Sequence, residues 1–259
     1  VLFLLLADEM PDKDALSDLK SQLSEHAAVP DYIWTILNSM PEVSHPMAMF
    51  ITAILAMEKE SVFRKNYDKG LKKDDFWKPT LEDGLKLIAK LPAIGAGIYR
   101  IRFQKGDLIE PDELLDWGAN FAHMLGLNDP DGNLKKLMRL YLMIHCDHEG
   151  GNASAFTSLT IGSTLSDLYY AVSGGLNALA GPLHGLANQE CLKFVLLTAE
   201  MCSEDHVSRP TVTTAPSIRV SMPWDCWKSS MRYCSALLPR PTSTRSSVKQ
   251  CLWRRSPTG

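Results

Sequence analysis

Hydrophobic residues recur at intervals of three and four along the first 200 residues, whereas the strict alternation typical of strands is weak. This spacing predicts helices over residues 14–26, 31–39, 47–59, 81–90 and 133–148. Proline disrupts helix interiors, so we expect five prolines to separate these helices: Pro30, Pro41, Pro46, Pro79 and Pro92. The pattern therefore predicts an all-α, multi-helical fold.

The clearest amphipathic segment is 133–148, whose apolar side carries Leu134, Leu137, Met138, Tyr141 and Ile144. We expect its last turn to present His145 and His148 on one face, because residues three apart are neighbours on a helix. A double glycine follows and is expected to end the helix. The next residues, 152–181, are rich in Ala, Ser and Gly, so we expect this segment to be buried between neighbouring helices.

His145 and His148 allow three interpretations. With Glu149 they could hold a metal ion, but their order matches no known zinc-protease motif and no third ligand is evident, so we predict no metal site. They could instead be a structural pair on a buried helix face. In the third interpretation they belong to a site for an anion or polar substrate, because Asn152 and Ser154 add short polar side chains near a helix junction.

His184 lies in the stretch AGPLHGLANQE, where Pro182 and Gly185 indicate a tight turn before a helix that is expected to begin near Gly185. The positive end of a helix dipole favours the neutral imidazole. A neutral imidazole can donate a hydrogen bond to a carbonyl oxygen and stabilise an enolate, as the helix-terminal histidine of triosephosphate isomerase does. The alternative is a capping or core role for this histidine.

Charge and composition divide the chain into two parts. The net charge is −3, but residues 203–259 hold nine Lys/Arg against three Asp/Glu, a balance of +6 that leaves −9 for residues 1–202. The second part is rich in Ser, Thr and Pro and has no sustained hydrophobic period. We therefore expect a helical domain over 1–202 and an irregular tail over 203–259 that is disordered or out of frame. The alternative is a basic tail for nucleic acid or an acidic partner, although its charges are scattered.

The six cysteines contain no CxxC pair, so neither a zinc site nor a disulfide framework is predicted, and a reducing or mitochondrial compartment is expected. No apolar run approaches the roughly 20 residues that a membrane-spanning helix needs. We therefore predict no membrane association.

Two motifs about thirty residues apart, HEGGN at 148–152 and AGPLHGLANQE at 180–190, resemble those of citrate synthase of the mitochondrial type. Further segments resemble that family in the same order, namely SHPMAMFITAILAM (44–57), LIAKLPAIGAGIYR (87–100), LDWGANFAHMLG (115–126) and LMRLYLMIHCDHEGGNASA (137–155). The likeness runs from about Val1 to between Cys191 and Cys202. It implies an incomplete form of the helical large domain of that family.

The resemblance implies an acyltransferase of the tricarboxylic acid cycle that condenses acetyl-CoA with oxaloacetate to give citrate and CoA. It implies that His184 hydrogen-bonds the thioester carbonyl and that His148 and Asn152 bind oxaloacetate. It further implies a homodimer in the mitochondrial matrix, in part through residues 133–181, with no metal, no cofactor besides the substrate acetyl-CoA, and no nucleic-acid partner.

The sequence also departs from the family pattern. The family uses a second catalytic histidine in a VPGYGHAVLR-like motif, an aspartate base and several arginines, and none of these motifs follows Gln189. His206 and Asp225 lie in unrelated settings. The absence of an initiating Met suggests missing residues upstream. The alternative function is therefore a catalytically incompetent fragment that retains at most ligand or subunit binding.

Overall fold

The computed structural model describes residues 1–146, 150–185, 189–190, 192–194 and 196–197. All regular secondary structure in these residues is helical, which confirms the predicted all-α fold. The α-helices of these residues, with two short 3₁₀-helices labelled η, are in chain order α1 (Leu2–Ala7), α2 (Lys13–Glu25), α3 (Asp31–Ser39), α4 (Pro46–Ala56), η1 (Met57–Glu60), α5 (Val62–Tyr67), η2 (Lys73–Asp75), α6 (Trp77–Arg102), α7 (Trp117–Leu125), α8 (Asn133–Ile144), α9 (Ala153–Gly162) and α10 (Leu168–Leu179).

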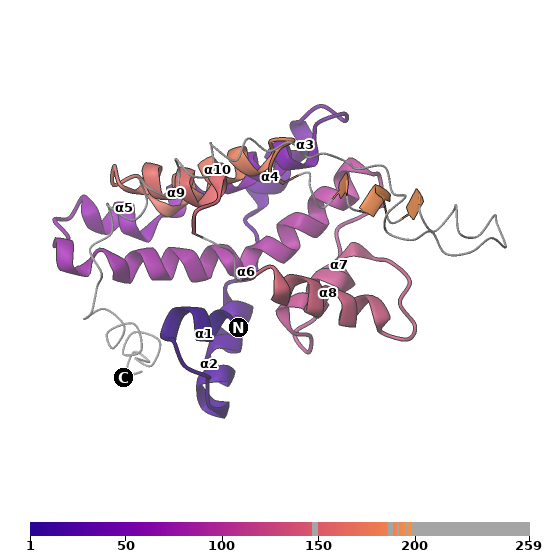
Figure 1. The fold of residues 1–259 in the computed structure, drawn as a ribbon, viewed down its shortest axis with the longest axis horizontal. Coiled ribbons are helices and arrows are strands. Elements are labelled where there is room, and N and C mark those ends of the chain that lie inside the picture. The colour runs from indigo at the N-terminus through magenta and orange to yellow at the C-terminus, as the bar shows by residue number, and fades with distance from the viewer. Residues whose placement is uncertain (147–149, 186–188, 191, 195, 198–259) are drawn as a thin grey trace, which may run out of the picture.

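Helix α6 is the central element of the fold. It has 26 residues and therefore a length of about 39 Å at 1.5 Å per residue. Helices α3, α4 and α10 lie along one side of α6, α1 and α2 lie on the opposite side, and α7 packs near its C-terminal end with α8 beyond it (Figure 1). Helix α9 packs against α10. The candidate motifs near residues 150 and 184 therefore lie on the α9–α10 side of α6.

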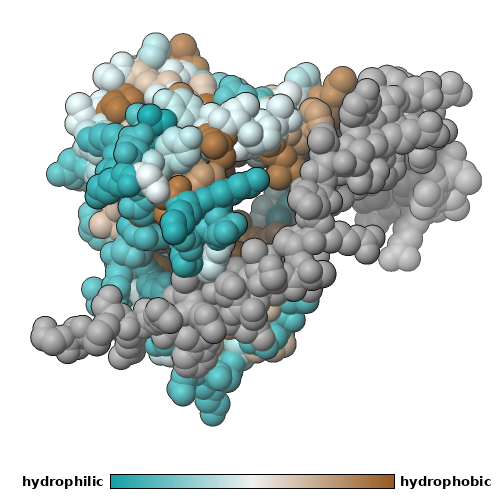
Figure 2. All heavy atoms as spheres, turned by 90° about the vertical axis from the view of Figure 1, so that its left-hand side faces the viewer, coloured by the Kyte–Doolittle hydropathy of each residue, from teal (hydrophilic) through white to brown (hydrophobic). Residues whose placement is uncertain are grey.

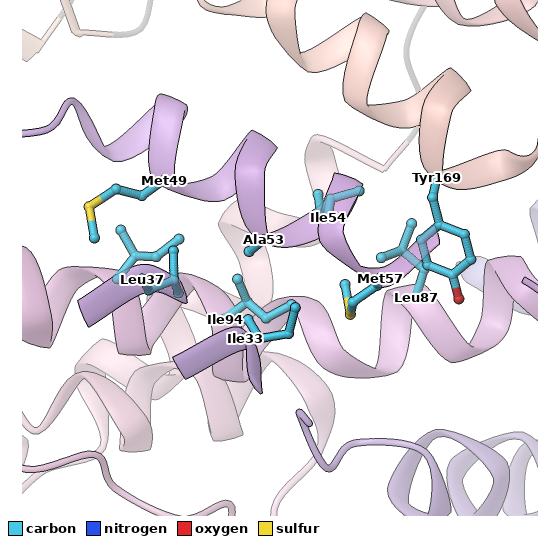
Figure 3. Close-up of a cluster of buried hydrophobic side chains, with 10 residues drawn as sticks. Ile33, Leu37, Met49, Ala53, Ile54, Met57, Leu87, Ile94 and Tyr169 are labelled. Atoms are coloured by element: carbon cyan, nitrogen blue, oxygen red, sulfur yellow. The ribbon is translucent and has the colours of Figure 1, made fainter. Parts of the chain in front are cut away.

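The main hydrophobic core lies between α3, α4, η1, α6 and α10 (Figure 3). Its ten buried residues are Ile33, Leu37, Met49, Ala53, Ile54, Met57, Leu87, Ile94, Ile98 and Tyr169. A smaller core joins α1 and α2 to α6 and consists of Phe3, Ala7, Ala15, Leu19 and Leu85. Because Tyr169 is 2% exposed and lies in the first turn of α10, the larger core fixes the start of that helix.

Local signals place the predicted helix boundaries closely. Helix α3 has the predicted bounds, and α2 begins and ends one residue before the predicted ones. The side chain of Asp12 accepts a hydrogen bond from the backbone nitrogen of Ala15 at 2.8 Å and so caps α2. Helix α4 begins at Pro46, the position where a missing N–H costs nothing. The predicted 47–59 helix tightens into η1 at its end.

The expectation that Pro79 and Pro92 separate helices is wrong, because both lie inside α6. Pro79 is in the first turn, where backbone N–H groups have no intrahelical partner. Pro92 lies mid-helix and cannot donate to the carbonyl of Ile88 four residues earlier. The indole nitrogen Nε1 of Trp117 donates to that carbonyl instead, at 2.8 Å. A side chain from α7 thus supplies the hydrogen bond that the helix lacks.

Replacing Trp117 by Phe should therefore leave the Ile88 carbonyl without its donor. We expect the free energy of unfolding to fall by about 1 kcal/mol, the lower end of the cost of an unsatisfied polar group, because the bond is partly buried. Urea denaturation followed by circular dichroism measures this change. Trp77→Phe is the matched control, because the Trp77 indole nitrogen donates to no carbonyl among the described residues. Equal losses in the two variants would contradict the role given to Trp117.

Helix α8 ends at Ile144, four residues before the predicted end. His145 is therefore the C-cap residue, and the expected presentation of His145 and His148 in one helical turn is wrong for His145; His148 itself lies outside the described residues. Burial of the 152–181 segment is confirmed only for α10, since α9 contains no buried residue. The difference arises because α10 packs against α4 and α6 as well as α9.

The apolar side of α8 faces outward. One face of the helix carries Leu137, Leu140, Tyr141 and Ile144, which are 54%, 53%, 41% and 62% exposed, respectively. The opposite side packs on α7, where the backbone of Arg139 approaches Gly118.

The end of the molecule that carries α5, in contrast, shows extensive hydrophilic surface with hydrophobic residues between (Figure 2). Within the described residues, no helix combines the length and hydrophobicity required to cross a bilayer.

Candidate functional site

The structure brings the two predicted motifs into contact through one hydrogen bond. The hydroxyl oxygen Oγ of Ser154 lies 2.7 Å from the ring nitrogen Nε2 of His184. These residues are thirty positions apart in the sequence, and both are partly buried. The contact places the imidazole beside the first turn of α9. We take this junction of α9 and the 181–185 turn as the candidate site.

Helix α9 begins at this site because Asn152 caps it. The side-chain oxygen Oδ1 of Asn152 accepts from the backbone nitrogen of Ala155 at 3.0 Å. Ser154 is the second residue of the helix, so its hydroxyl lies at the end where the helix dipole is positive. No acidic residue occupies the first turn. The local electrostatics therefore favour a negatively charged ligand.

The turn that carries His184 folds back on the C-terminal end of α10. The backbone nitrogen of His184 donates to the Gly181 carbonyl at 3.0 Å, and that of Gly185 donates to the Leu179 carbonyl at 3.0 Å. A Cβ atom on Gly185 would collide with the same Leu179 oxygen. Glycine is therefore required at position 185 for a steric reason, and the close approach of the turn to α10 holds the His184 ring in place.

The sequence placed His184 at the start of a helix, and the structure places it in a turn that follows α10. Residues 182–185 form this turn, and the next described helical residues are 189–190. Gly185, where the helix was expected to begin, belongs to this turn, and residues 186–188 lie outside the described part of the chain. The contact that the described residues give to the imidazole is therefore the hydrogen bond with Ser154 and not a helix start at position 185.

Helix α10, which supports the turn, is itself capped by a buried carboxylate. The Asp167 side chain accepts from the backbone nitrogens of Tyr169 and Tyr170 at 2.9 and 3.2 Å. Burial raises the pKa of this carboxyl, and the carboxylates of Glu58 and Asp83 add to the increase, although the two N–H groups oppose it. The cap thus carries a charge that its surroundings disfavour.

This pKa shift predicts how the stability of the fold depends on pH. The pKa of Asp167 is higher in the folded state than in the unfolded state, so its contribution is most favourable below pH 3.8 and is lost as pH rises through the folded pKa. Asp167→Asn keeps a capping oxygen and cannot ionise. We therefore expect the free energy of unfolding of this variant, relative to the wild type, to increase from pH 4 to pH 7 in urea titrations.

Asp167→Ala is the matched control for that experiment, because it removes the capping oxygen. It should cost about 1 kcal/mol at neutral pH. A constant difference between the Asn variant and the wild type across this range would contradict the assigned pKa shift.

The other predicted residues have mixed outcomes. His148, His206 and Asp225 lie outside the described residues. His145 is exposed, and its Nδ1 lies 2.7 Å from the Tyr141 carbonyl on its own helix. Among the described residues, no group of three or more His, Cys, Asp or Glu side chains is arranged to hold a metal ion. The structure thus places His184 in contact with Ser154, two residues after the helix cap Asn152.

Ser154 was expected only as one of several polar residues near an anion, and its bond to His184 could not be anticipated. A serine in a run of small residues has no sequence signal that names a partner thirty positions away.

A separate cavity of about 490 Å³ is lined by α2, α5 and α6 residues that include Gln22, Asn66, Lys78 and Glu82. That cavity involves neither α9 nor α10 and is not the candidate site.

The site thus combines a hydroxyl–imidazole contact with a helix N-terminus, an arrangement suited to binding an anion. The family described as "Citrate synthase, C-terminal domain" matches residues 1–212. The chain belongs to the citrate synthase family, as the sequence resemblance predicted. Family and fold are thus confirmed together.

Individual relatives agree with this assignment. Mitochondrial citrate synthase 4 of Arabidopsis thaliana is 47% identical over 205 residues, which cover 79% of this chain and 43% of that protein. Peroxisomal citrate synthase of Saccharomyces cerevisiae is 43% identical over 212 residues, which cover 82% and 45%. The crystal structure of citrate synthase from Pyrobaculum aerophilum superposes with a TM-score of 0.68 at 25% identity and covers 90% of this chain and 60% of that one. The chain thus spans less than half the length of these two curated relatives.

Proposed function

We propose that this chain carries part of the active site for the condensation of acetyl-CoA with oxaloacetate and water to citrate and CoA. In this proposal His184 donates a hydrogen bond to the thioester carbonyl oxygen of acetyl-CoA, and Asn152 and His148 bind oxaloacetate. The supporting observation is the 2.7 Å contact between Ser154 and His184, which joins the two motifs in one place. Family membership supplies the reaction.

The donor role proposed for His184 requires a ring proton on the nitrogen that faces the thioester oxygen. We assign Ser154 as the donor to Nε2 of His184, so the imidazole is neutral with its proton on Nδ1. Among the described residues, Nδ1 makes no hydrogen bond. An N–H donor aimed at the thioester oxygen would stabilise the enolate that forms when the methyl group loses a proton, because negative charge gathers on that oxygen.

The N-terminus of α9 supports the proposed position of oxaloacetate. This substrate carries two carboxylates, and the first turn of α9 combines a positive helix end with no acidic residue. Asn152 lies at this end, and the hydrogen bond that its side chain accepts from the Ala155 nitrogen caps the helix there. The enolate carbon and the acceptor carbonyl would therefore meet near Ser154. The proposal assigns no metal and no further cofactor to this step.

The test is citrate formation by the 259-residue chain, measured together with thiol release from acetyl-CoA. We expect both products to require both substrates and to form in equal amounts. Absence of citrate under conditions in which the chain is folded would overturn the proposed activity and leave the alternative of an inactive member of the family.

The relatives support a mitochondrial location, since the plant proteins from Arabidopsis, Daucus carota and Solanum tuberosum are all mitochondrial citrate synthases.

We also propose that the chain forms a homodimer through the exposed apolar side of α8. A contiguous apolar helix face in contact with water favours association with a complementary surface, and a twofold axis would place two such faces together.

Sedimentation velocity tests the homodimer. We expect a dimer for the wild type and a monomer for Leu140→Glu, because a charge in the centre of the interface is costly to bury. Leu114→Glu is the matched control, since Leu114 is 94% exposed and lies outside α8. A wild-type monomer, or a dimer that survives Leu140→Glu, would contradict the proposed interface.

A further inference from the structure

Helix α10 contacts both segments that form the Ser154–His184 contact. The turn that carries His184 bonds to the Leu179 carbonyl through the Gly185 nitrogen at 3.0 Å. One turn earlier on α10, Gly175 faces α9. The ideal Cβ position of Gly175 lies 3.0 Å from the Ser154 carbonyl oxygen and would collide with the hydroxyl of Ser158. Residues 175 and 179 are four apart and so lie on one side of the helix.

We propose that Gly175 is a positioning residue that holds α9 close enough to α10 for the Ser154 hydroxyl to reach His184. The importance of this contact for catalysis rests on the function proposed above, whereas the contact itself does not. The inference concerns one specific distance, the 2.7 Å between Oγ of Ser154 and Nε2 of His184.

A side chain at position 175 would push against the backbone of Ser154. A Cβ atom at 3.0 Å from the Ser154 carbonyl oxygen is closer than such contacts normally are, so the backbone of Ser154 must move by a few tenths of an ångström. His184 cannot follow, because its turn is tied to Leu179. A shift of that size lengthens the 2.7 Å contact to about 3 Å and tilts it, and a hydrogen bond weakens as it lengthens and loses its alignment. A methyl group at 175 therefore acts on the bond through Ser154.

The neighbouring residue Gly174 gives a matched comparison on the same helix. Its Cβ would meet the terminal carbon Cδ1 of Ile161, which lies at the end of a flexible side chain near the last turn of α9. Rotation of that side chain can relieve the contact without a backbone shift at Ser154. Gly174→Ala therefore perturbs the same helix pair while leaving the His184 contact intact.

The experiment records ¹⁵N spectra of the histidine rings in the ligand-free chain, with the His184 signal assigned by its loss in His184→Ala. In the wild type we expect a neutral ring with the proton on Nδ1 and an accepted hydrogen bond at Nε2. Gly175→Ala should move the tautomer balance of His184 toward that of Ser154→Ala, the reference without the hydroxyl. Gly174→Ala should retain the wild-type pattern.

Ser158→Ala combined with Gly175→Ala guards against simple misfolding. This pair removes the collision with the Ser158 hydroxyl and leaves only the contact at the Ser154 carbonyl. We expect the double variant to fold and still to show the altered His184 signal. A wild-type His184 signal in the folded single or double variant would overturn the positioning role.

Citrate formation separates this inference from the proposed function. If the wild type is active, Gly175→Ala should lower kcat by roughly 3- to 10-fold, because a misplacement of about 1 Å costs about 10²-fold and this shift is a fraction of that. An altered His184 signal in a chain that makes no citrate would support the positioning role and reject the function. An active chain whose His184 signal is unchanged by Gly175→Ala would support the proposed function and reject the positioning role.

Discussion

His184→Ala is expected to lower the rate of citrate formation by about 10²- to 10³-fold, the usual cost of removing one donor that stabilises an oxyanion. The fold should survive, because the ring is only partly buried and its described side-chain hydrogen bond is the one to Ser154. The loss should fall mainly on kcat, since the donor acts most strongly when charge develops on the thioester oxygen. Steady-state kinetics with thiol detection measures both constants.

His123→Ala provides the matched control for this experiment. His123 is also partly buried and lies in the last turn of α7, which packs on α6 and α8. Its removal should leave kcat within about twofold of the wild type, as expected for a residue away from the reacting atoms. An unchanged rate in His184→Ala, or equal losses in the two variants, would reject the donor role proposed for His184.

Gly185→Ala should have the second large effect, because no side chain fits at this position. Its Cβ would collide with the Leu179 carbonyl oxygen, a backbone atom that cannot rotate away. Relief of this collision requires the turn to lift from α10 and break the 3.0 Å bond from the Gly185 nitrogen. We expect a loss of roughly 1–3 kcal/mol in the free energy of unfolding, and a fall in kcat comparable with that of His184→Ala.

Urea denaturation and the kinetic assay test this second expectation together. Gly162→Ala is the control, because no atom lies within 4 Å of the position its Cβ would occupy. Gly162 ends α9, one helix away from the His184 turn. If Gly185→Ala had wild-type stability and activity, the turn would not depend on the close approach to Leu179.

Several features of the fold could be read from the sequence because their causes are local. Asp12 and Pro46 mark the starts of α2 and α4 through side-chain capping and a fixed backbone angle, both of which act within one helical turn. Pro92 was misread for the opposite reason. Its helix continues because Trp117, 25 residues later, donates to the orphaned Ile88 carbonyl.

The outward side of α8 is a similar case. The sequence shows an amphipathic helix but not which side meets the protein. Packing of the Arg139 backbone on Gly118 turns Leu137 and Ile144 toward solvent. The periodicity alone favours burial of the apolar side, so this orientation required knowledge of the neighbouring helix.

The motifs around Asn152 and His184 were evident in the sequence, because the residue types and their flanking glycines indicate a turn, a helix start and a polar ligand. The family assignment follows from the same residues and is confirmed by the match over 1–212. The partner of His184, the steric need for glycine at 185 and the closeness of α9 to α10 at Gly175 emerged only in three dimensions. Contacts between residues far apart in the chain depend on how whole helices pack, and packing at a precision of tenths of an ångström leaves no mark in local residue patterns.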